Sequence, residues 1–122
     1  MTLHSFRDLR VWQGGMDLVE GVYCLTKAFP RHEVYGLASQ MQRAAVSIPS
    51  NIAEGYVRQH RKEYLQHLSI AQASLAELDT QLEIAARLKY LSQAQAQPIQ
   101  ESMTSLGKQL YTLRASLSKA KT

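Results

Sequence analysis

Residues 68–85 read LSIAQASLAELDTQLEIA, and the spacing within this stretch decides the fold. Six of its apolar residues recur at intervals of three and four, which places them on one face of a helix. They form two rows with a seven-residue repeat: Leu68, Leu75 and Leu82 beside Ala71, Leu78 and Ala85. A helix with one apolar stripe buries that stripe against other elements. The stretch therefore predicts a long amphipathic helix inside a helical bundle.

Three more segments carry a similar apolar spacing. Together with the first stretch they predict four helices, at about residues 8–28, 33–57, 61–89 and 93–118. Pro30 ends the first helix because proline cannot continue one, and Ser92 with Gln95 fits a capping box at the start of the last. In the first helix we expect two core rows, Leu9, Met16 and Tyr23 beside Trp12, Val19 and Thr26.

Pro49 lies inside the second segment, and the apolar spacing continues on both sides of it. An interior proline removes one backbone hydrogen bond and bends the helix. We therefore expect a continuous helix that is kinked at Pro49. The alternative is a break, after which Asn51 and Glu54 cap a new short helix. Ser47 and Ser50 are expected to satisfy the backbone groups that the proline frees.

The composition agrees with an all-α protein. The chain has 122 residues, of which 45% are apolar, and its six glycines and three prolines are too few for an all-β fold. Short connections join antiparallel neighbours, so residues 1–122 predict a single domain, an up-down-up-down antiparallel four-helix bundle. We find no apolar run of membrane-spanning length and no apolar segment of a signal peptide near the N-terminus. We therefore expect a cytoplasmic protein with no membrane partner.

The residue types that catalysis or metal binding needs are not grouped. The histidines are His4, His32, His60 and His67. A di-iron bundle site needs Glu-x-x-His on two helices, whereas Glu63 lies four residues before His67, so we interpret the histidines as solvated surface groups. The single Cys24 excludes an internal disulfide and predicts an inert buried or half-buried thiol. We expect no catalytic residue, no cofactor and no metal.

The positive charge is better organised, within a net charge of +4. In the predicted topology the first helix starts at the end where the second finishes, the third starts and the fourth finishes. We call this end the basic pole; it unites Arg7, Arg10, Arg58, His60, Arg61 and Lys62 with Arg114, Lys119 and Lys121 near the C-terminus. Such a pole suits contacts with phosphates, and Arg43, further along the second helix, could extend it. Alternatively, the charges form a solvated corner, with Tyr56 and Tyr64 as core or boundary residues.

Several blocks of the sequence are similar to one family. Residues 6–13 read FRDLRVWQ, and residues 40–55 read QMQRAAVSIPSNIAEG. Over residues 6 to about 91 the chain resembles the bacterial four-helix-bundle family of 23S rRNA intervening-sequence proteins. That family includes the accessory variability determinant of diversity-generating retroelements. The resemblance does not distinguish the role of an rRNA-insertion protein from that of a retroelement accessory.

The resemblance implies a ring-like homopentamer that binds nucleic acid, RNA or DNA, through basic surface and has no catalytic activity. For retroelement members it also implies a reverse transcriptase as partner. The basic positions of the matching block are Arg43, Arg58 and, just beyond it, Arg61, whereas Gln42 stands where many relatives have another cation. The alternative is a scaffolding module that recruits a protein such as a reverse transcriptase without touching nucleic acid. Residues 51–55 either form a surface site or serve the proline and the helix end.

Overall fold

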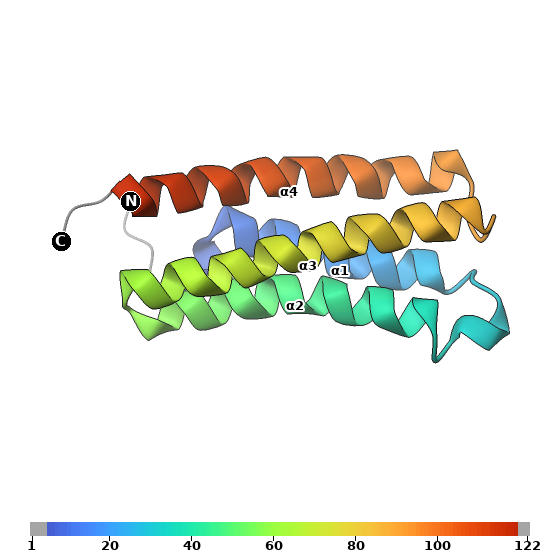
Figure 1. Cartoon of the computed structure of the whole chain (residues 1–122), viewed down its shortest axis with the longest axis horizontal. Coiled ribbons are helices and arrows are strands. Elements are labelled where there is room, and N and C mark those ends of the chain that lie inside the picture. Colours follow the sequence, from blue (N-terminus) through green and yellow to red (C-terminus); the bar gives the residue numbers. More distant parts are fainter. Residues whose placement is uncertain (1–4, 120–122) are drawn as a thin grey trace.

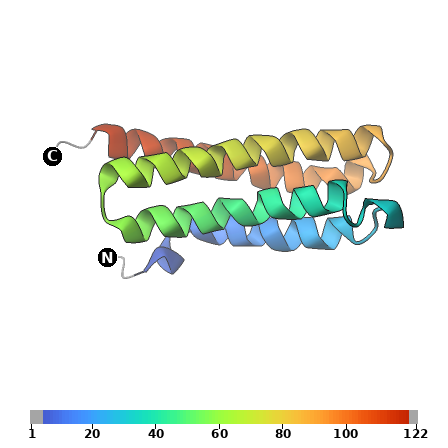
Figure 2. The ribbon, with the colours of Figure 1, turned by 60° about the horizontal axis from the view of Figure 1, so that its bottom comes forward.

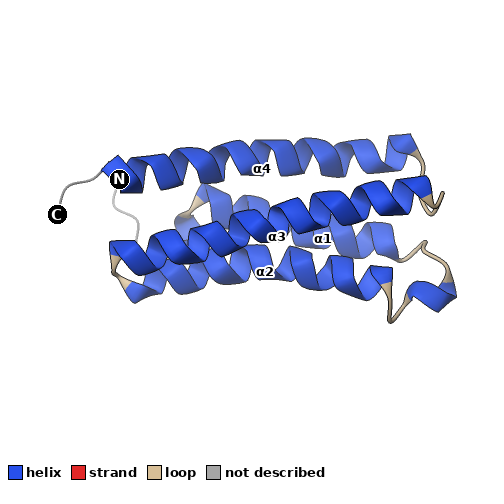
Figure 3. Ribbon diagram, in the orientation of Figure 1, coloured by secondary structure: helices blue, strands red, loops and turns tan. Residues whose placement is uncertain are grey.

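The computed structural model describes residues 5–119, which contain four α-helices and two short 3-10 turns. Figures 1 and 3 show a helical bundle, with no strand in the described part of the chain. In chain order the elements are η1 (Phe6–Asp8), α1 (Arg10–Thr26), η2 (Arg31–Glu33), α2 (Leu37–Arg58), α3 (Arg61–Arg87) and α4 (Gln93–Lys119).

Consecutive helices run in opposite directions, as the two views of Figures 1 and 2 agree. The all-α four-helix bundle is therefore confirmed. The α2–α3 pair makes the most extensive contact, and α4 packs less tightly against α1 and α3. Among the helices that the structure describes, none combines the length and the hydropathy that crossing a membrane requires.

The helix ends differ from the predicted ones where side chains or backbone conformation intervene. The second helix begins at Leu37, four residues later than expected, because the Glu33 carboxylate accepts the Leu37 N–H at 2.9 Å and Gly36 is not helical. The third helix ends at Arg87, and Lys89 adopts a left-handed conformation with φ 65°. The fourth begins with the predicted capping box: Gln95 N–H donates to the Ser92 hydroxyl, and Ser92 N–H donates to the Gln95 side chain.

The core confirms the stripe that was identified in α3 and corrects the one expected in α1. All six stripe residues of α3 are buried. In α1 the buried face consists instead of Val11, Gly15, Leu18, Val22 and Thr26. The predicted rows were wrong for Met16 and Tyr23, which are 39% and 43% exposed. Thr26 is buried, and Leu9, Trp12 and Val19 are half-buried and pack against the core. Helix α1 therefore carries a second apolar face at the edge of the core, of which Met16 and Tyr23 are exposed.

Pro49 lies inside α2, which continues to Arg58, so the predicted continuous helix is confirmed. Its ring is buried against α1, where a Cβ on Gly15 would lie 3.3 Å from the ring atoms. The serines do not act as expected. The Ser47 hydroxyl bonds with Ser74 of α3 at 2.9 Å, and Ser50 is exposed.

Gly55 allows the close approach of α2 to α3. A Cβ at this position would lie 2.7 Å from the His67 Cβ and 3.1 Å from a Tyr64 ring carbon. Gly107 in α4 differs, because the nearest atom to its added Cβ, in Leu75, is 3.5 Å away, an ordinary contact distance.

We predict that Gly55→Ala and Gly107→Ala change stability in opposite directions. Gly55→Ala should lower the free energy of unfolding by about 1–3 kcal/mol through overpacking. Gly107→Ala should raise it by up to about 1 kcal/mol, because alanine is the better helix former. Urea unfolding followed by circular dichroism measures both. Stabilisation by Gly55→Ala would show that α2 and α3 are not held at this separation.

Candidate nucleic-acid interface

The α2–α3 corner positions three of the candidate cations. Arg58 is the last residue of α2 and is exposed. Gln59 then takes the left-handed conformation, and the extended His60 forms the N-cap of α3. Arg61 and Lys62 begin α3, with Lys62 exposed and Arg61 half-buried and engaged in an interaction. The two-residue connection therefore keeps all these cations within one turn of the corner.

The helix ends strengthen the positive potential at this corner. The last turn of a helix favours cations, which accounts for Arg58 as an ordinary surface charge. The first turn instead favours acids, and Glu63 lies in it, but Arg61 and Lys62 precede that acid in α3, and His60 makes no side-chain capping hydrogen bond. Their charges add to the positive end of the helix dipole, where backbone N–H groups also point outward. This arrangement attracts anions.

The start of the described chain adds Arg7 in η1, which contacts both α1 and α2, and Arg10 at the start of α1. The Arg7 guanidinium lies 4.7 Å from the centre of the Phe6 ring, which packs at 5.5 Å against Trp12. Arg10 is the first residue of α1 and is exposed. Figure 1 shows the start of α1, the α2–α3 corner and the end of α4 on the same side of the bundle.

The remaining candidates are less favourably placed. Exposed Arg43 lies fifteen residues before Arg58 on α2, which is about 22 Å along the helix axis. Arg114 of α4 is half-buried and donates to the Gln72 side chain of α3. Lys119 is exposed at the end of α4, whereas Lys121 lies outside the described residues. The structure thus places the cations of residues 58–62 at one corner, with residues 7–10 toward the same end of the bundle and Arg43 apart.

A polar network that the sequence did not reveal crosses the α2–α3 interface beside the pole. The Asn51 amide donates to the Ser47 carbonyl at 2.9 Å, so its oxygen accepts from His67 Nδ1 at 3.0 Å. His67 is half-buried, and its interpretation as a solvated surface group was wrong. Asn51 therefore links α2 to α3 through hydrogen bonds and does not cap a new helix after Pro49. Polar residues at core-facing spacings, Ser47 and Asn51 opposite His67 and Ser74, were the signal that could have revealed it.

Two further expectations concern single residues. Cys24 is exposed, so the expected buried thiol was wrong. Tyr56 and Tyr64 are half-buried with their rings edge-to-face at 6.1 Å, as expected for boundary residues. Burial, and secondarily Tyr56, raises the pKa of Tyr64 to about 12. Within residues 5–119 no group of three or more His, Cys, Asp or Glu side chains could hold a metal ion.

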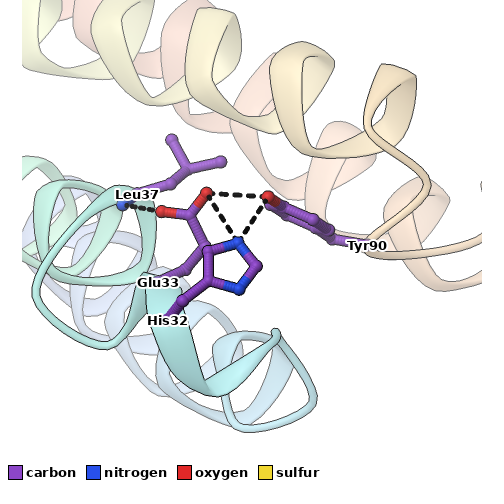
Figure 4. Close-up of polar contacts among 4 residues, drawn as sticks. All are labelled: His32, Glu33, Leu37 and Tyr90. Carbon is purple, nitrogen blue, oxygen red and sulfur yellow. Dashed lines mark hydrogen bonds and ion pairs between the residues drawn. The ribbon is translucent and has the colours of Figure 1, made fainter.

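At the opposite end of the bundle, Glu33 links two connections through hydrogen bonds (Figure 4). One carboxylate oxygen accepts the Leu37 N–H at 2.9 Å, and the other accepts the Tyr90 hydroxyl at 2.7 Å. These two hydrogen bonds lower the pKa of Glu33, and the bond to Glu33 raises the pKa of Tyr90. The Tyr90 ring also packs against Phe29 at 5.4 Å. The α1–α2 connection is thereby joined to the α3–α4 connection.

These features define a four-helix bundle whose candidate site is a charged surface. The model of the 23S rRNA-intervening sequence protein family matches residues 7–112, so the chain belongs to this family. It is also similar in fold to a protein of unknown function from the S23 ribosomal protein family of Bacteroides thetaiotaomicron. That similarity has a TM-score of 0.78 at 24% identity and covers 86% of this chain and 95% of the other. No curated protein matches the chain in sequence.

We predict that Asn51→Ala destabilises the protein by about 1–2 kcal/mol, because it leaves His67 Nδ1 and the Ser47 groups without this partner. Ser50→Ala, at an exposed position on the same helix, should change stability by less than about 0.5 kcal/mol. Urea unfolding compares the two variants. In the wild type, ¹⁵N NMR of the neutral imidazole should place the His67 proton on Nδ1. A proton on Nε2 would contradict the network.

Proposed function

We propose that this chain binds the phosphate backbone of nucleic acid through the basic pole and does so as a homo-oligomer, without a catalytic step. The observation that carries the proposal is the placement of Arg61 and Lys62 at a helix N-terminus, next to Arg58 at a helix C-terminus. Cations in the first turn of α3 do not stabilise that helix. They do favour the binding of an anion at this position. Membership in a family named for sequences that intervene in 23S rRNA agrees with an RNA partner.

The distribution of charge along the chain supports binding at the end of the bundle, not along its sides. Between the two ends of the bundle the described acids are Asp17, Glu20, Glu77, Asp79 and Glu101, against the cations Arg43 and Lys108. The sides of the bundle are therefore net negative, and nucleic acid is repelled from them. Phosphate contacts hold a nucleic acid in place without reading its sequence, so we propose recognition of backbone rather than of bases at the pole.

The second apolar face of α1 supports self-association. Trp12, Met16 and Val19 border a shallow groove, and α2 completes it with Val46, Pro49 and Ala53. An amphipathic helix of a monomer normally keeps such side chains on its core side alone, and exposed apolar patches mark interaction surfaces. We propose that a second copy of the chain covers this groove. A ring of five copies, as the family resemblance implies, would bring several basic poles into one assembly.

Binding to duplex RNA or DNA should weaken as salt increases, and Arg58→Ala/Lys62→Ala should flatten that dependence. Each lost phosphate contact reduces the slope of log K against log salt by about 0.9 on duplex DNA, so the double variant should lose up to about 1.8. Fluorescence anisotropy across a salt series measures the slopes. Arg87→Ala, which removes an exposed cation from the last turn of α3 at the other end of the bundle, is the control and should leave the slope unchanged.

An equal loss per charge in the double variant and in Arg87→Ala would contradict the assignment of the pole. No binding of the wild type even at low salt would favour the scaffolding alternative, in which the chain recruits a protein such as a reverse transcriptase. Circular dichroism and the oligomer mass, measured in parallel, exclude unfolding or dissociation as the cause of lost binding.

Val46→Glu should break the homo-oligomer and leave the fold intact. Val46 is 40% exposed at the groove, so glutamate is tolerated in a monomer but is buried without a partner in an interface. Ile70→Glu is the matched control, because Ile70 is 49% exposed on α3. Light scattering coupled to size exclusion gives the mass. A monomeric wild type, or equal dissociation by both variants, would contradict an interface at this groove.

A further inference from the structure

The end opposite the basic pole carries cations that the sequence motifs did not single out. It is formed by the α1–α2 connection, residues 27–36, and the α3–α4 connection, residues 88–92, which we call the distal surface. Lys27, Arg31 and Lys89 are all exposed on it. No ion pair within residues 5–119 involves these three side chains. Figure 1 shows both connections at one end of the bundle, away from the α2–α3 corner.

The one acid in these connections is already engaged. Both Glu33 carboxylate oxygens accept hydrogen bonds, from Leu37 and Tyr90, and the Glu33 side chain is only 19% exposed. It therefore stabilises the connections while offering little charge to a ligand. His32 lies beside it, with Nε2 3.4 Å from the Tyr90 hydroxyl and its side chain exposed. The distal surface thus presents a net positive charge.

The same surface exposes an aromatic ring. Tyr35 is 95% exposed, and Val34 and Leu88 are each about half exposed, at 51% and 53%. The fold gains no burial from a tyrosine in this position, because its ring contacts almost nothing in the chain. A ring that is open on both faces can stack on a nucleobase. Exposed aromatic rings beside unpaired cations are the combination by which proteins bind single strands.

The backbone that carries these groups is held in place. The Glu33–Tyr90 hydrogen bond joins the two connections, and the Phe29 and Tyr90 rings pack beneath them. Figure 4 shows the carboxylate between the Leu37 amide and the Tyr90 hydroxyl. A surface that is already ordered loses less conformational entropy when it binds a ligand. The distal surface is therefore ordered before a ligand binds, although its residues lie on connections between helices.

We propose that the distal surface is a second nucleic-acid site, which binds single-stranded segments by stacking a base on Tyr35 and pairing phosphates with Arg31 and Lys89. The site goes beyond the function of the basic pole, and the two have no residue in common. The 27 residues of α3 separate the two ends by about 40 Å, with the acidic sides between them. One bundle would therefore hold two separate segments of nucleic acid, one at each end.

The test uses a fluorescein-labelled oligouridine and the full chain carrying Arg58→Ala/Lys62→Ala, which weakens the basic pole. In this background Tyr35→Ala should weaken binding about 5- to 150-fold, from the stacking contribution of one base. Tyr35→Phe should restore most of it, because the ring is retained. Arg31→Ala/Lys89→Ala should flatten the slope of log K against log salt by up to about 1.4, at about 0.7 for each single-strand contact. Tyr35 is exposed, so its replacement should not affect folding.

Several outcomes would overturn the proposal. Equal affinity of the Tyr35→Ala and Tyr35→Phe variants would exclude stacking, and equal affinity for poly-glutamate would show charge attraction without recognition of bases. Loss of all binding through the pole substitutions alone would leave the proposed function standing and remove the distal site. Binding that survives those substitutions but is lost with Tyr35→Ala would support the distal site, even if the pole fails its own test.

Discussion

The close packing of α2 against α3 is the constraint on which the rest of the structure depends. Gly55 lets the helices approach, since a side chain there would collide with His67. Asn51 then bridges the interface to His67, and Ser47 bonds with Ser74. Helices held this closely can be joined by two residues, Gln59 and His60. Because the connection is so short, Arg58 and the cations that begin α3 occupy a single corner.

The packing of the other helices determines which surfaces remain available. Helix α1 contacts α2 through Gly15 and Pro49, and its core face is complete without Trp12 or Met16. Trp12 is half-buried against the edge of the core and Met16 is exposed, and the proposed self-association would bury both. Five of the ten acidic residues lie along the sides of the bundle, whereas most of the cations lie toward its ends. The core, the proposed self-association and the charge thus use different faces of the same helices.

The four helices, the stripe of α3 and the capping box at Ser92 followed from the sequence because each depends on residues close together in the chain. Which face of α1 is buried did not follow from the sequence. Both Leu9–Met16–Tyr23 and Val11–Leu18 have a seven-residue spacing, so periodicity could not decide which face is buried. The role of His67 depended on Asn51 across the interface, and the start of α2 depended on the Glu33 carboxylate. The cluster of distal cations could not be predicted from the sequence, because its members lie on two connections that are more than fifty residues apart.

The most direct test of the account is to crosslink the protein to RNA containing 4-thiouridine and to identify the modified peptides by mass spectrometry. Contact through the ends of the bundle predicts crosslinks within residues 6–12 and 56–64, and within residues 32–36 for single-stranded RNA. The middle of α3 and of α4, where the acids lie, should remain unmodified. Crosslinks confined to those middle segments, or none above the level of a non-binding protein, would contradict the central claim that the ends of this bundle bind nucleic acid.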